Sequence, residues 1–400
     1  YSSRQRLWIV SLTIVLDLSF LFYFKYFNFV VDNINGVLAT DFQLLDVIMP
    51  IGISFYTFQA MSYLIDVYRR EVPAQKDVYK LALYIVLFPQ LVAGPIVKYH
   101  DVCEQIDNRT IEFKNVIIGF KRFITGLAKK VLIANTLAEV VDKIFAQAPE
   151  NLTTGVSWLG AVAYCLQLYY DFSGYSDMAI GLGLMFGFRF LENFNYPYIS
   201  KSITEFWRRW HISLATWFKL YLYIPLGGNR KGAVRTYWNL FAVFLVTGIW
   251  HGAAWSYVAW GIWNGIFIVI ERFFGLDKDK NDRWYVSAAK HVYAFFAIVW
   301  GMIIFRAESL SYAYEYICRM LHIDVTKHLP DYDYGVNNKF AIMLIVGLIC
   351  AMPVCRNLIY IKYEHKVQRT LVNIWLFLLF FWSTISLAAS TYNPFIYFRF

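Results

Sequence analysis

The stretch Gly248-Ile249-Trp250-His251-Gly252-Ala253-Ala254-Trp255 (GIWHGAAW) ends a long apolar run that begins near Trp238. A run of this length is typical of a helix that crosses a bilayer, which takes about 20 apolar residues. An ionisable side chain inside such a helix is costly and is by default a functional hypothesis. The stretch therefore predicts both a membrane-spanning segment and a histidine whose presence packing alone does not explain.

The rest of the chain shares this apolar character. Of its 400 residues, 58% are hydrophobic, 20% are aromatic and 16% are charged, whereas a soluble domain carries about 25% charged residues. No shift in composition divides the chain, which predicts an all-α polytopic membrane protein with a single domain over residues 1–400. The apolar runs lie at 7–31, 44–65, 156–170, 237–258, 259–274, 289–305, 340–355 and 371–389.

The net charge of +9 is spread over several short basic clusters. Such clusters between spans are typical of cytoplasmic loops under the positive-inside rule. We therefore expect the lipid bilayer as a partner and no nucleic acid. The clusters are Arg69, Arg70, Lys76 and Lys80; Lys121, Arg122, Lys129 and Lys130; Arg230, Lys231 and Arg235; and Arg356, Lys362, Lys366 and Arg369.

The five cysteines contain no C-x-x-C pair and are interpreted as small buried residues. Two isolated histidines without nearby carboxylate or thiolate spacing predict no metal site.

The chain opens with Tyr1 rather than methionine, and we interpret it as lacking N-terminal residues of its protein.

Two segments are expected to be irregular or interfacial. Residues 87–95 place two prolines and a glycine in an apolar run, which predicts a re-entrant segment beside a pocket, because broken backbone at membrane depth must be buried or line a cavity. Residues 200–227 predict an amphipathic helix that starts at a capping box of Ser202 and Glu205 and stops at Pro225. Its aromatic face suits the headgroup region.

Of the seven histidines, His211 and His251 lie on apolar or aromatic faces, and the others are expected to have no role. Each of the two alone fits a core histidine bonded to a backbone carbonyl. Gly248 and Gly252 allow close helix packing around His251, but packing does not explain the imidazole. Burial disfavours the charged ring, so a neutral imidazole could accept a proton from a hydroxyl, as acyl transfer from a thioester requires.

Motifs of other enzyme classes are missing: there is no G-x-S-x-G, H-E-x-x-H or P-loop. Gly181-x-Gly183-x-x-x-Gly187 departs from the dinucleotide fingerprint and better suits helix packing.

Asp171 and Asp177 fit either local hydrogen bonds around a glycine break in the helix or a role in lining a pocket. The loop 227–232, Gly-Gly-Asn-Arg-Lys-Gly, fits either a plain cytoplasmic loop or a cradle for a donor phosphate.

An ordered series of motifs resembles the membrane-bound O-acyltransferase family, in particular its bacterial alginate O-acetyltransferase branch. The resemblance covers the chain from about residue 50 onward, with one departure at Asn264-Gly265, where many relatives have His-Gly. The motifs are 50–59 (PIGISFYTFQ), 88–96 (FPQLVAGPI), 171–177 (DFSGYSD), 206–214 (FWRRWHISL), 223–230 (YIPLGGNR), 250–253 (WHGA) and the ending 392–400 (YNPFIYFRF).

The resemblance implies helices around a central tunnel, with His251 as the catalytic residue and His211 as the second active-site residue. It also implies an acyl thioester donor (acetyl-CoA or an acyl carrier protein) and no tightly bound cofactor. The acceptor would be an exported polysaccharide, served by an extracytoplasmic acyltransferase partner at a bacterial cytoplasmic membrane. We further expect a substrate or donor pocket formed by Trp210, Trp250, Asp177, Asn229 and Arg230.

Two other functions stay open on the sequence. One is D-alanyl transfer to teichoic acids, by a related branch that also has the two histidines. The other is a glycolipid transporter or flippase, which the lack of an inverted repeat and the few intramembrane charges disfavour.

Overall fold

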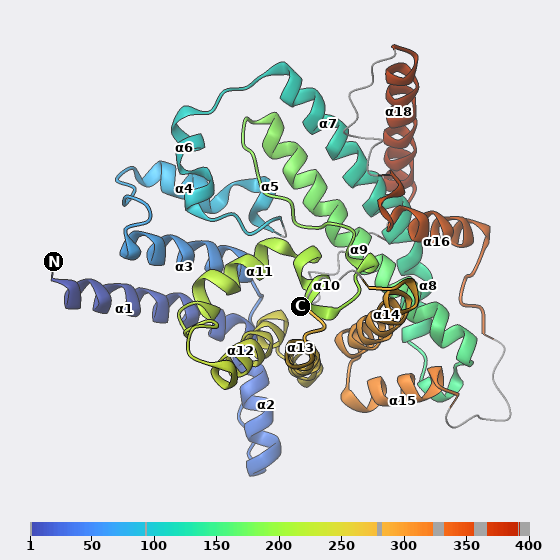
Figure 1. The fold of residues 1–400 in the computed structure, drawn as a ribbon, viewed down its shortest axis with the longest axis horizontal. Coiled ribbons are helices and arrows are strands. Elements are labelled where there is room, and N and C mark those ends of the chain that lie inside the picture. Colours follow the sequence, from blue (N-terminus) through green and yellow to red (C-terminus); the bar gives the residue numbers. More distant parts are fainter. Residues whose placement is uncertain are drawn as a thin grey trace.

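A computed structural model describes residues 2–92, 94–277, 282–322, 332–355, 366–390 and 392. Helices dominate these ranges and no strand occurs in them (Figure 1), which confirms the all-α prediction. The first half contains α1 (Ser3–Leu21), η1 (Phe22–Tyr26), α2 (Phe27–Leu38), α3 (Ile53–Arg69), α4 (Val78–Val86), α5 (Phe88–Leu91), α6 (Tyr99–Asn108), α7 (Phe113–Ala128), η2 (Lys129–Ala134), α8 (Asn135–Phe145), η3 (Pro149–Asn151) and α9 (Thr154–Met185). The second half contains η4 (Pro197–Ile199), α10 (Ile203–Arg209), α11 (Ile212–Phe218), η5 (Lys219–Tyr223), α12 (Ala233–His251), α13 (Trp255–Phe274), α14 (Trp284–Arg306), α15 (Leu310–Met320), α16 (Asn338–Cys350), η6 (Pro353–Cys355) and α18 (Lys366–Ala389).

The helices α7 and α9 run side by side through the middle of the molecule (Figure 1). Two glycine pairs, Gly119 with Gly181 and Gly126 with Gly174, lie at their contact. A Cβ on Gly126 would lie 2.5 Å from the carbonyl oxygen of Gly174, and one on Gly119 would overlap that of Gly181. Because the paired glycines recur every seven residues on both helices, the backbones touch along two turns of the same face.

Ion pairs join α9 to α7 and to the adjoining η2 beside the glycines. Lys130 Nζ lies 2.5 Å from Asp171 Oδ1, and Asp177 accepts from Arg122 at 2.8 Å and from Lys129 at 2.6 Å. The basic cluster 121–130, which the sequence predicts as a cytoplasmic loop, is therefore part of a packed helix. The predicted glycine break near Asp171 is also wrong, because α9 continues to Met185 and its glycines serve close packing.

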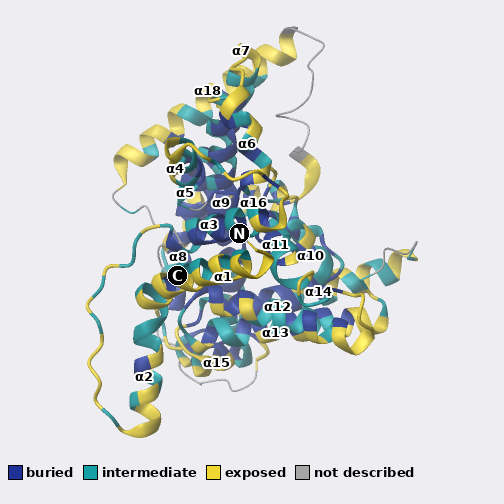
Figure 2. Ribbon diagram, turned by 90° about the vertical axis from the view of Figure 1, so that its left-hand side faces the viewer, coloured by how far each residue is buried: buried dark blue, intermediate teal, exposed yellow. Residues whose placement is uncertain are grey.

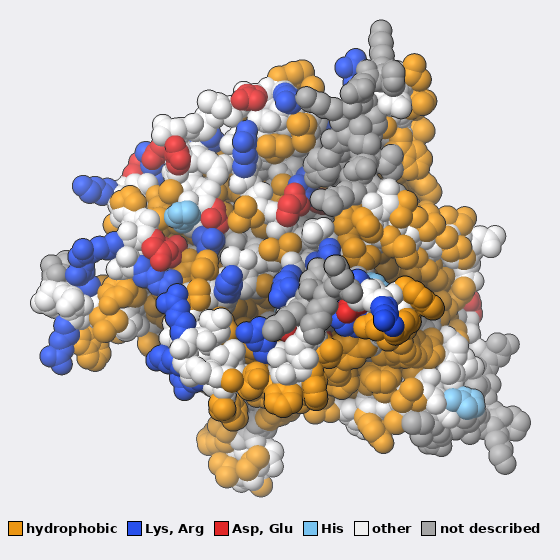
Figure 3. Space-filling model, in the orientation of Figure 1, with side chains coloured by type: hydrophobic (Ala, Val, Ile, Leu, Met, Phe, Trp, Pro, Cys, Tyr) orange, Lys and Arg blue, Asp and Glu red, His pale blue; other side chains and the backbone are white. Residues whose placement is uncertain are grey.

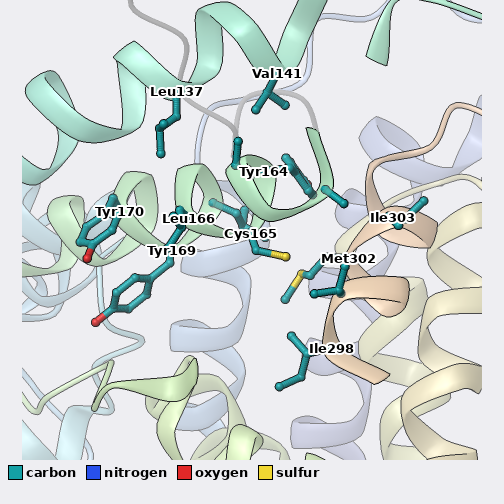
Figure 4. Packing of buried hydrophobic residues seen from close by; sticks show 14 of the residues in the cluster. Leu137, Val141, Tyr164, Cys165, Leu166, Tyr169, Tyr170, Ile298, Met302 and Ile303 are labelled. Carbon is teal, nitrogen blue, oxygen red and sulfur yellow. The ribbon is translucent and has the colours of Figure 1, made fainter. Parts of the chain in front are cut away.

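The hydrophobic core forms where α8, α9 and α14 meet. Figure 4 shows Leu137 and Val141 of α8, several residues of α9, and Ile298 and Met302 of α14 around a common centre. Burial is greatest in the middle of the molecule, and the outer ends of α2, α7 and α18 are exposed (Figure 2). The core thus surrounds α9, whose middle, residues 163–174, is buried on every side.

Three described helical segments are long and apolar enough to span a membrane: Ser3–Leu38, Trp284–Arg306 and Val367–Ala389. Much of the apolar surface of the first and third is exposed, and apolar side chains cover a large part of the face in Figure 3. A soluble protein rarely exposes such continuous apolar surface. The protein is therefore a multi-pass membrane protein.

Several predicted spans have other boundaries in the structure. The run 44–65 becomes helical only at Ile53, the run 156–170 belongs to the much longer α9, and the run 237–258 is divided by a break at 252–254. The predicted boundaries failed because hydropathy shows which segments avoid water but not where helices end. Gly52 marks one such end, since it has φ +78° and a Cβ there would lie 2.6 Å from the carbonyl oxygen of Leu91.

The glycine contact between α7 and α9 gives a stability prediction. Gly126→Val should destabilise the purified protein by about 1–3 kcal/mol or more, because the added atoms overlap the α9 backbone. Gly155→Val is the matched control, since Gly155 is also helical and nothing lies within 4 Å of a Cβ there. Thermal unfolding in detergent measures both, and an unchanged Tm for Gly126→Val would contradict the close contact.

Candidate active site

His251 is the last residue of α12, so it lies at a helix end rather than in the middle of a span. The helix ends there because Gly252 adopts extended backbone. The two flanking glycines pack closely: a Cβ on Gly248 would overlap the carbonyl oxygen of Tyr257, and one on Gly252 would overlap the Tyr257 ring. The G-x-x-x-G therefore packs α12 on α13, as expected, and the imidazole is left at the break between them.

His211 lies at a second break, between α10 and α11. It has φ 46° and ψ 53°, a left-handed conformation that is uncommon for a residue with a side chain. The predicted continuous interfacial helix is thus wrong, because it divides at Trp210 and His211 and much of its aromatic face is buried in the core. Ser202 does cap α10 by accepting from the N–H of Glu205, and the helical turns end at Tyr223, before Pro225.

Asn193 holds the His211 break in place. Its Oδ1 accepts from the backbone N–H of Ser213 at 3.1 Å and from Ser213 Oγ at 2.9 Å, and lies 3.2 Å from Nδ1 of His211. Its Nδ2 donates to Ser176 Oγ of α9 at 3.0 Å. Ser213 Oγ in turn accepts from the N–H of Ile96 at 3.0 Å. Asn193 could not be picked out from the sequence, since one asparagine in a loop gives no pattern.

Trp250 brings the two histidines together. Its ring centroid lies 4.8 Å from that of His251 and 6.4 Å from that of His211. Each of the three rings has one buried nitrogen without a hydrogen-bond partner among the described residues: Trp250 Nε1, His251 Nδ1 and His211 Nε2. Buried polar atoms are rarely left unpaired in folded proteins. Three of them at one place indicate a site for a polar ligand or water.

Two cavities adjoin this ring cluster. The smaller, of about 280 Å³, is lined by His251, Trp250, Val92 and the segment 49–55. The larger, of about 410 Å³, is lined by the helix break 252–254 and by Phe305, Arg306 and other residues. Lys25 and Met49 line both cavities. The resemblance implies a central tunnel, and the structure has these two adjoining cavities beside His251, whereas His211 is fully buried and lines neither of them.

Broken backbone surrounds the smaller cavity. Leu87 is extended between α4 and α5, and the following Pro89, Gln90 and Pro95 are buried. Val92 of this segment lines the cavity, which agrees with the expectation of an irregular segment beside a pocket. Residues 49–52, before α3, line it too. The polar backbone at these breaks is tolerated at depth because it borders a cavity.

The other predicted pocket residues lie elsewhere. Of the five, only Trp250 lines one of the two cavities. Trp210 packs its ring on Phe194 and Phe206, and Asp177 is held by the ion pairs to α7 and η2. Asn229 and Arg230 are exposed in the turn between η5 and α12. They line neither cavity, because that turn lies on the surface whereas both histidines are buried.

Asn264, the departure from the family pattern, links α13 to α10. Its Oδ1 accepts from Trp207 Nε1 at 3.0 Å, and its Nδ2 donates to the carbonyl oxygen of Trp260 at 2.8 Å. Glu271, two turns further along α13, accepts from the N–H groups at the start of α10. These contacts hold α10 against α13 and so fix the chain segment that leads to His211.

No cluster of three or more His, Cys, Asp or Glu side chains that could hold a metal ion occurs in the part of the chain that the structure describes.

Two sequence predictions lie outside the described residues. They are the family-like ending after Tyr392, which comprises residues 393–400, and positions 356–365 of the last basic cluster. The remaining members of that cluster, Lys366 and Arg369, belong to α18 rather than to a loop.

Comparison with known proteins identifies the family. The model of the membrane-bound O-acyltransferase family matches residues 69–311, a range that includes both histidines. The probable alginate O-acetylase AlgI of Pseudomonas putida is 43% identical over 96% of this chain and 83% of the relative. Its counterpart in Pseudomonas aeruginosa is 50% identical over 77% of this chain and 59% of the relative.

A peptidoglycan O-acetyltransferase of Helicobacter pylori is 33% identical over 91% of this chain and 75% of the relative. Relatives named teichoic acid D-alanyltransferase match less well, at 28% and 30% identity over 64% and 58% of this chain. The family model and the near-full-length relatives agree with each other and with the fold. The chain therefore belongs to the membrane-bound O-acyltransferase family and is similar to its alginate O-acetylase members.

Proposed function

We propose that this protein is an O-acetyltransferase of a bacterial cytoplasmic membrane that moves acetyl groups toward hydroxyls of an exported cell-surface polysaccharide. The donor is a cytoplasmic thioester, either acetyl-CoA or an acyl carrier protein. An extracytoplasmic acyltransferase partner completes delivery to the polymer. The names of the alginate and peptidoglycan relatives support acetyl as the acyl group.

The observation that carries this proposal is the set of three unpaired ring nitrogens around Trp250. They lie beside a cavity lined by His251 in a chain of the acyltransferase family. A hydroxyl that enters this cavity can donate its hydrogen bond to a neutral imidazole. The surrounding aromatic rings limit the space open to water, which helps to protect a reactive acyl group from hydrolysis.

In the proposed reaction, His251 acts as general base. It takes the proton of the acceptor hydroxyl while the hydroxyl oxygen forms a bond to the thioester carbonyl carbon. The carbon–sulfur bond then breaks, and the departing thiolate receives the proton from His251. The products are an ester and a free thiol, and the imidazole returns to its neutral form.

The contacts of Asn193 support a positioning role for His211. Asn193 Oδ1 accepts from the backbone N–H of Ser213, so this atom is the oxygen and the facing Nδ1 of His211 carries the hydrogen. The other ring nitrogen, Nε2, is then an acceptor. It can receive a hydrogen bond from a substrate hydroxyl or from a water molecule that orients the substrate.

D-alanyl transfer has less support, because the D-alanyltransferase relatives are more distant than the acetyltransferases. The flippase alternative has no observation in its favour. Ester analysis of surface polymers from cells with and without the protein separates the three functions. We expect the loss of polymer-bound acetate, whereas loss of D-alanine or no change would contradict acetyl transfer.

The two histidines should differ when each is replaced. A general base contributes about 10²–10⁴-fold in rate, so His251→Asn should abolish acetyl transfer from a labelled thioester in reconstituted membranes. His211→Asn should keep measurable activity, because an amide replaces one imidazole hydrogen bond. His291→Asn is the control, since that residue is exposed on α14. Equal and complete loss in both variants would make His211 as essential as His251.

Asn193→Ala should lower activity through His211. The variant removes the amide oxygen that faces Nδ1 of His211 and leaves only Ser213 Oγ, 3.4 Å away, so the ring is held less firmly. Asn193→Ala added to His211→Asn should lower activity little further, because both changes act through one ring. The control is Asn195→Ala, an exposed neighbour. Additive losses in the double variant would contradict this coupling.

The orientation of the chain gives a prediction about its basic loops. Arg69, at the end of α3, donates to the carbonyl oxygen of Leu220 in η5, so the loops after these elements lie on one side. Lys and Arg side chains gather over the left part of the face in Figure 3. Cysteines placed at Lys76 and Lys231, in a chain without its native cysteines, should react with an impermeant maleimide only after cells are permeabilised. Labelling in intact cells would contradict a cytoplasmic location.

A further inference from the structure

Lys25 is a half-buried lysine that lines both cavities. It belongs to η1, a π-helical turn between α1 and α2, and such turns are frequent at functional sites. In the sequence it is one lysine within the apolar run 7–31 and belongs to no motif. A lysine in an apolar span is costly and is a functional hypothesis by default.

Its ammonium is bound to the helix end that carries His251. Lys25 Nζ donates to the carbonyl oxygen of Trp250 at 2.8 Å and to Ser54 Oγ at 3.2 Å. It also lies 5.7 Å from the centroid of the Trp250 ring. An ammonium has three N–H donors, and the hydrogen bonds seen among the described residues use two of them. The third is available to a molecule in the cavities.

The carbonyl oxygens at the end of α12 can be hydrogen-bonded without a charged donor. Tyr26, the next residue of η1, donates from its hydroxyl to the carbonyl oxygen of Ile249 at 2.9 Å and to that of Trp250 at 3.3 Å. Tyr26 thus satisfies the same group of terminal carbonyls but lines neither cavity. A neutral hydroxyl is enough to hold these carbonyls, so the ammonium of Lys25 has a further use.

We infer that Lys25 is a further catalytic residue, which binds the oxygen that becomes negative during acyl transfer. This inference rests on the proposed function. When the acceptor hydroxyl adds to the thioester carbonyl and gives its proton to His251, the carbonyl electron pair moves to oxygen. The third N–H of Lys25 donates to that oxyanion. The carbonyl then re-forms, the carbon–sulfur bond breaks, and the thiolate takes the proton from His251.

The test compares Lys25→Met with Tyr26→Phe in reconstituted membranes, using a labelled acetyl thioester and the partner proteins. Loss of one oxyanion donor costs about 10²–10³-fold in kcat, so Lys25→Met should lose this much while its KM for the thioester changes little. Tyr26→Phe removes hydrogen bonds to the same carbonyls and should stay near the wild-type kcat. Ser54→Ala, which removes a partner of Lys25 but no charge, should fall between the two.

A second pair of measurements separates the loss of the Lys25 ammonium from misfolding of the variant. Lys25→Cys, in a chain without its native cysteines, is assayed before and after aminoethylation, which restores an ammonium at nearly the length of lysine. Recovery of kcat in the same protein sample would support the inference. The inference is overturned if aminoethylation restores nothing, if Lys25→Met raises only KM, or if Tyr26→Phe and Lys25→Met lose equal activity.

The wild-type protein separates this inference from the proposed function. If it transfers no acetyl group from any thioester tested, the proposed function fails. If it is active and Lys25→Met has normal kcat, only the role of Lys25 fails.

Discussion

The contact between α7 and α9 is the constraint on which the site depends. Two glycine pairs let the backbones touch, and ion pairs to Asp171 and Asp177 hold the helices in register. With α9 fixed in this way, Ser176 can reach Asn193, and Phe172 packs its ring 4.7 Å from that of His211. A buried charge is tolerated only when it is paired, so these carboxylates keep α9 in one position.

The residues proposed to act in the reaction lie where helices are interrupted. His251 ends α12, His211 divides α10 from α11, and Lys25 lies in the π-helical turn η1. A regular helix satisfies its own backbone and leaves no polar group for a ligand. An interruption frees carbonyl and N–H groups, and in a membrane these must meet protein or a cavity. The breaks at His251 and Lys25 therefore supply both cavity walls and groups that can face a substrate.

The proposed chemistry depends on a small number of polar groups that lie among packed aromatic rings. Trp250 contacts both histidines, and Phe55 and Phe58 pack against Trp250 in turn. Electrostatic interactions are stronger in such a water-poor place than in solvent. A neutral imidazole and one ammonium are then enough to move a proton and to stabilise a developing negative charge.

The sequence by itself determined the membrane class, the family and the two histidines as candidates, because hydropathy and motif order are local properties. It could not place Asn193 or Lys25, whose partners lie 18 and 225 residues away along the chain. It also predicted a continuous helix through His211 and pocket roles for Asp177, Asn229 and Arg230. Only the tertiary structure decided these points, because helix ends and ion pairs depend on which segments pack together. A hydrophobic pattern shows that a segment avoids water, but the neighbours that give a residue its function come from distant parts of the chain.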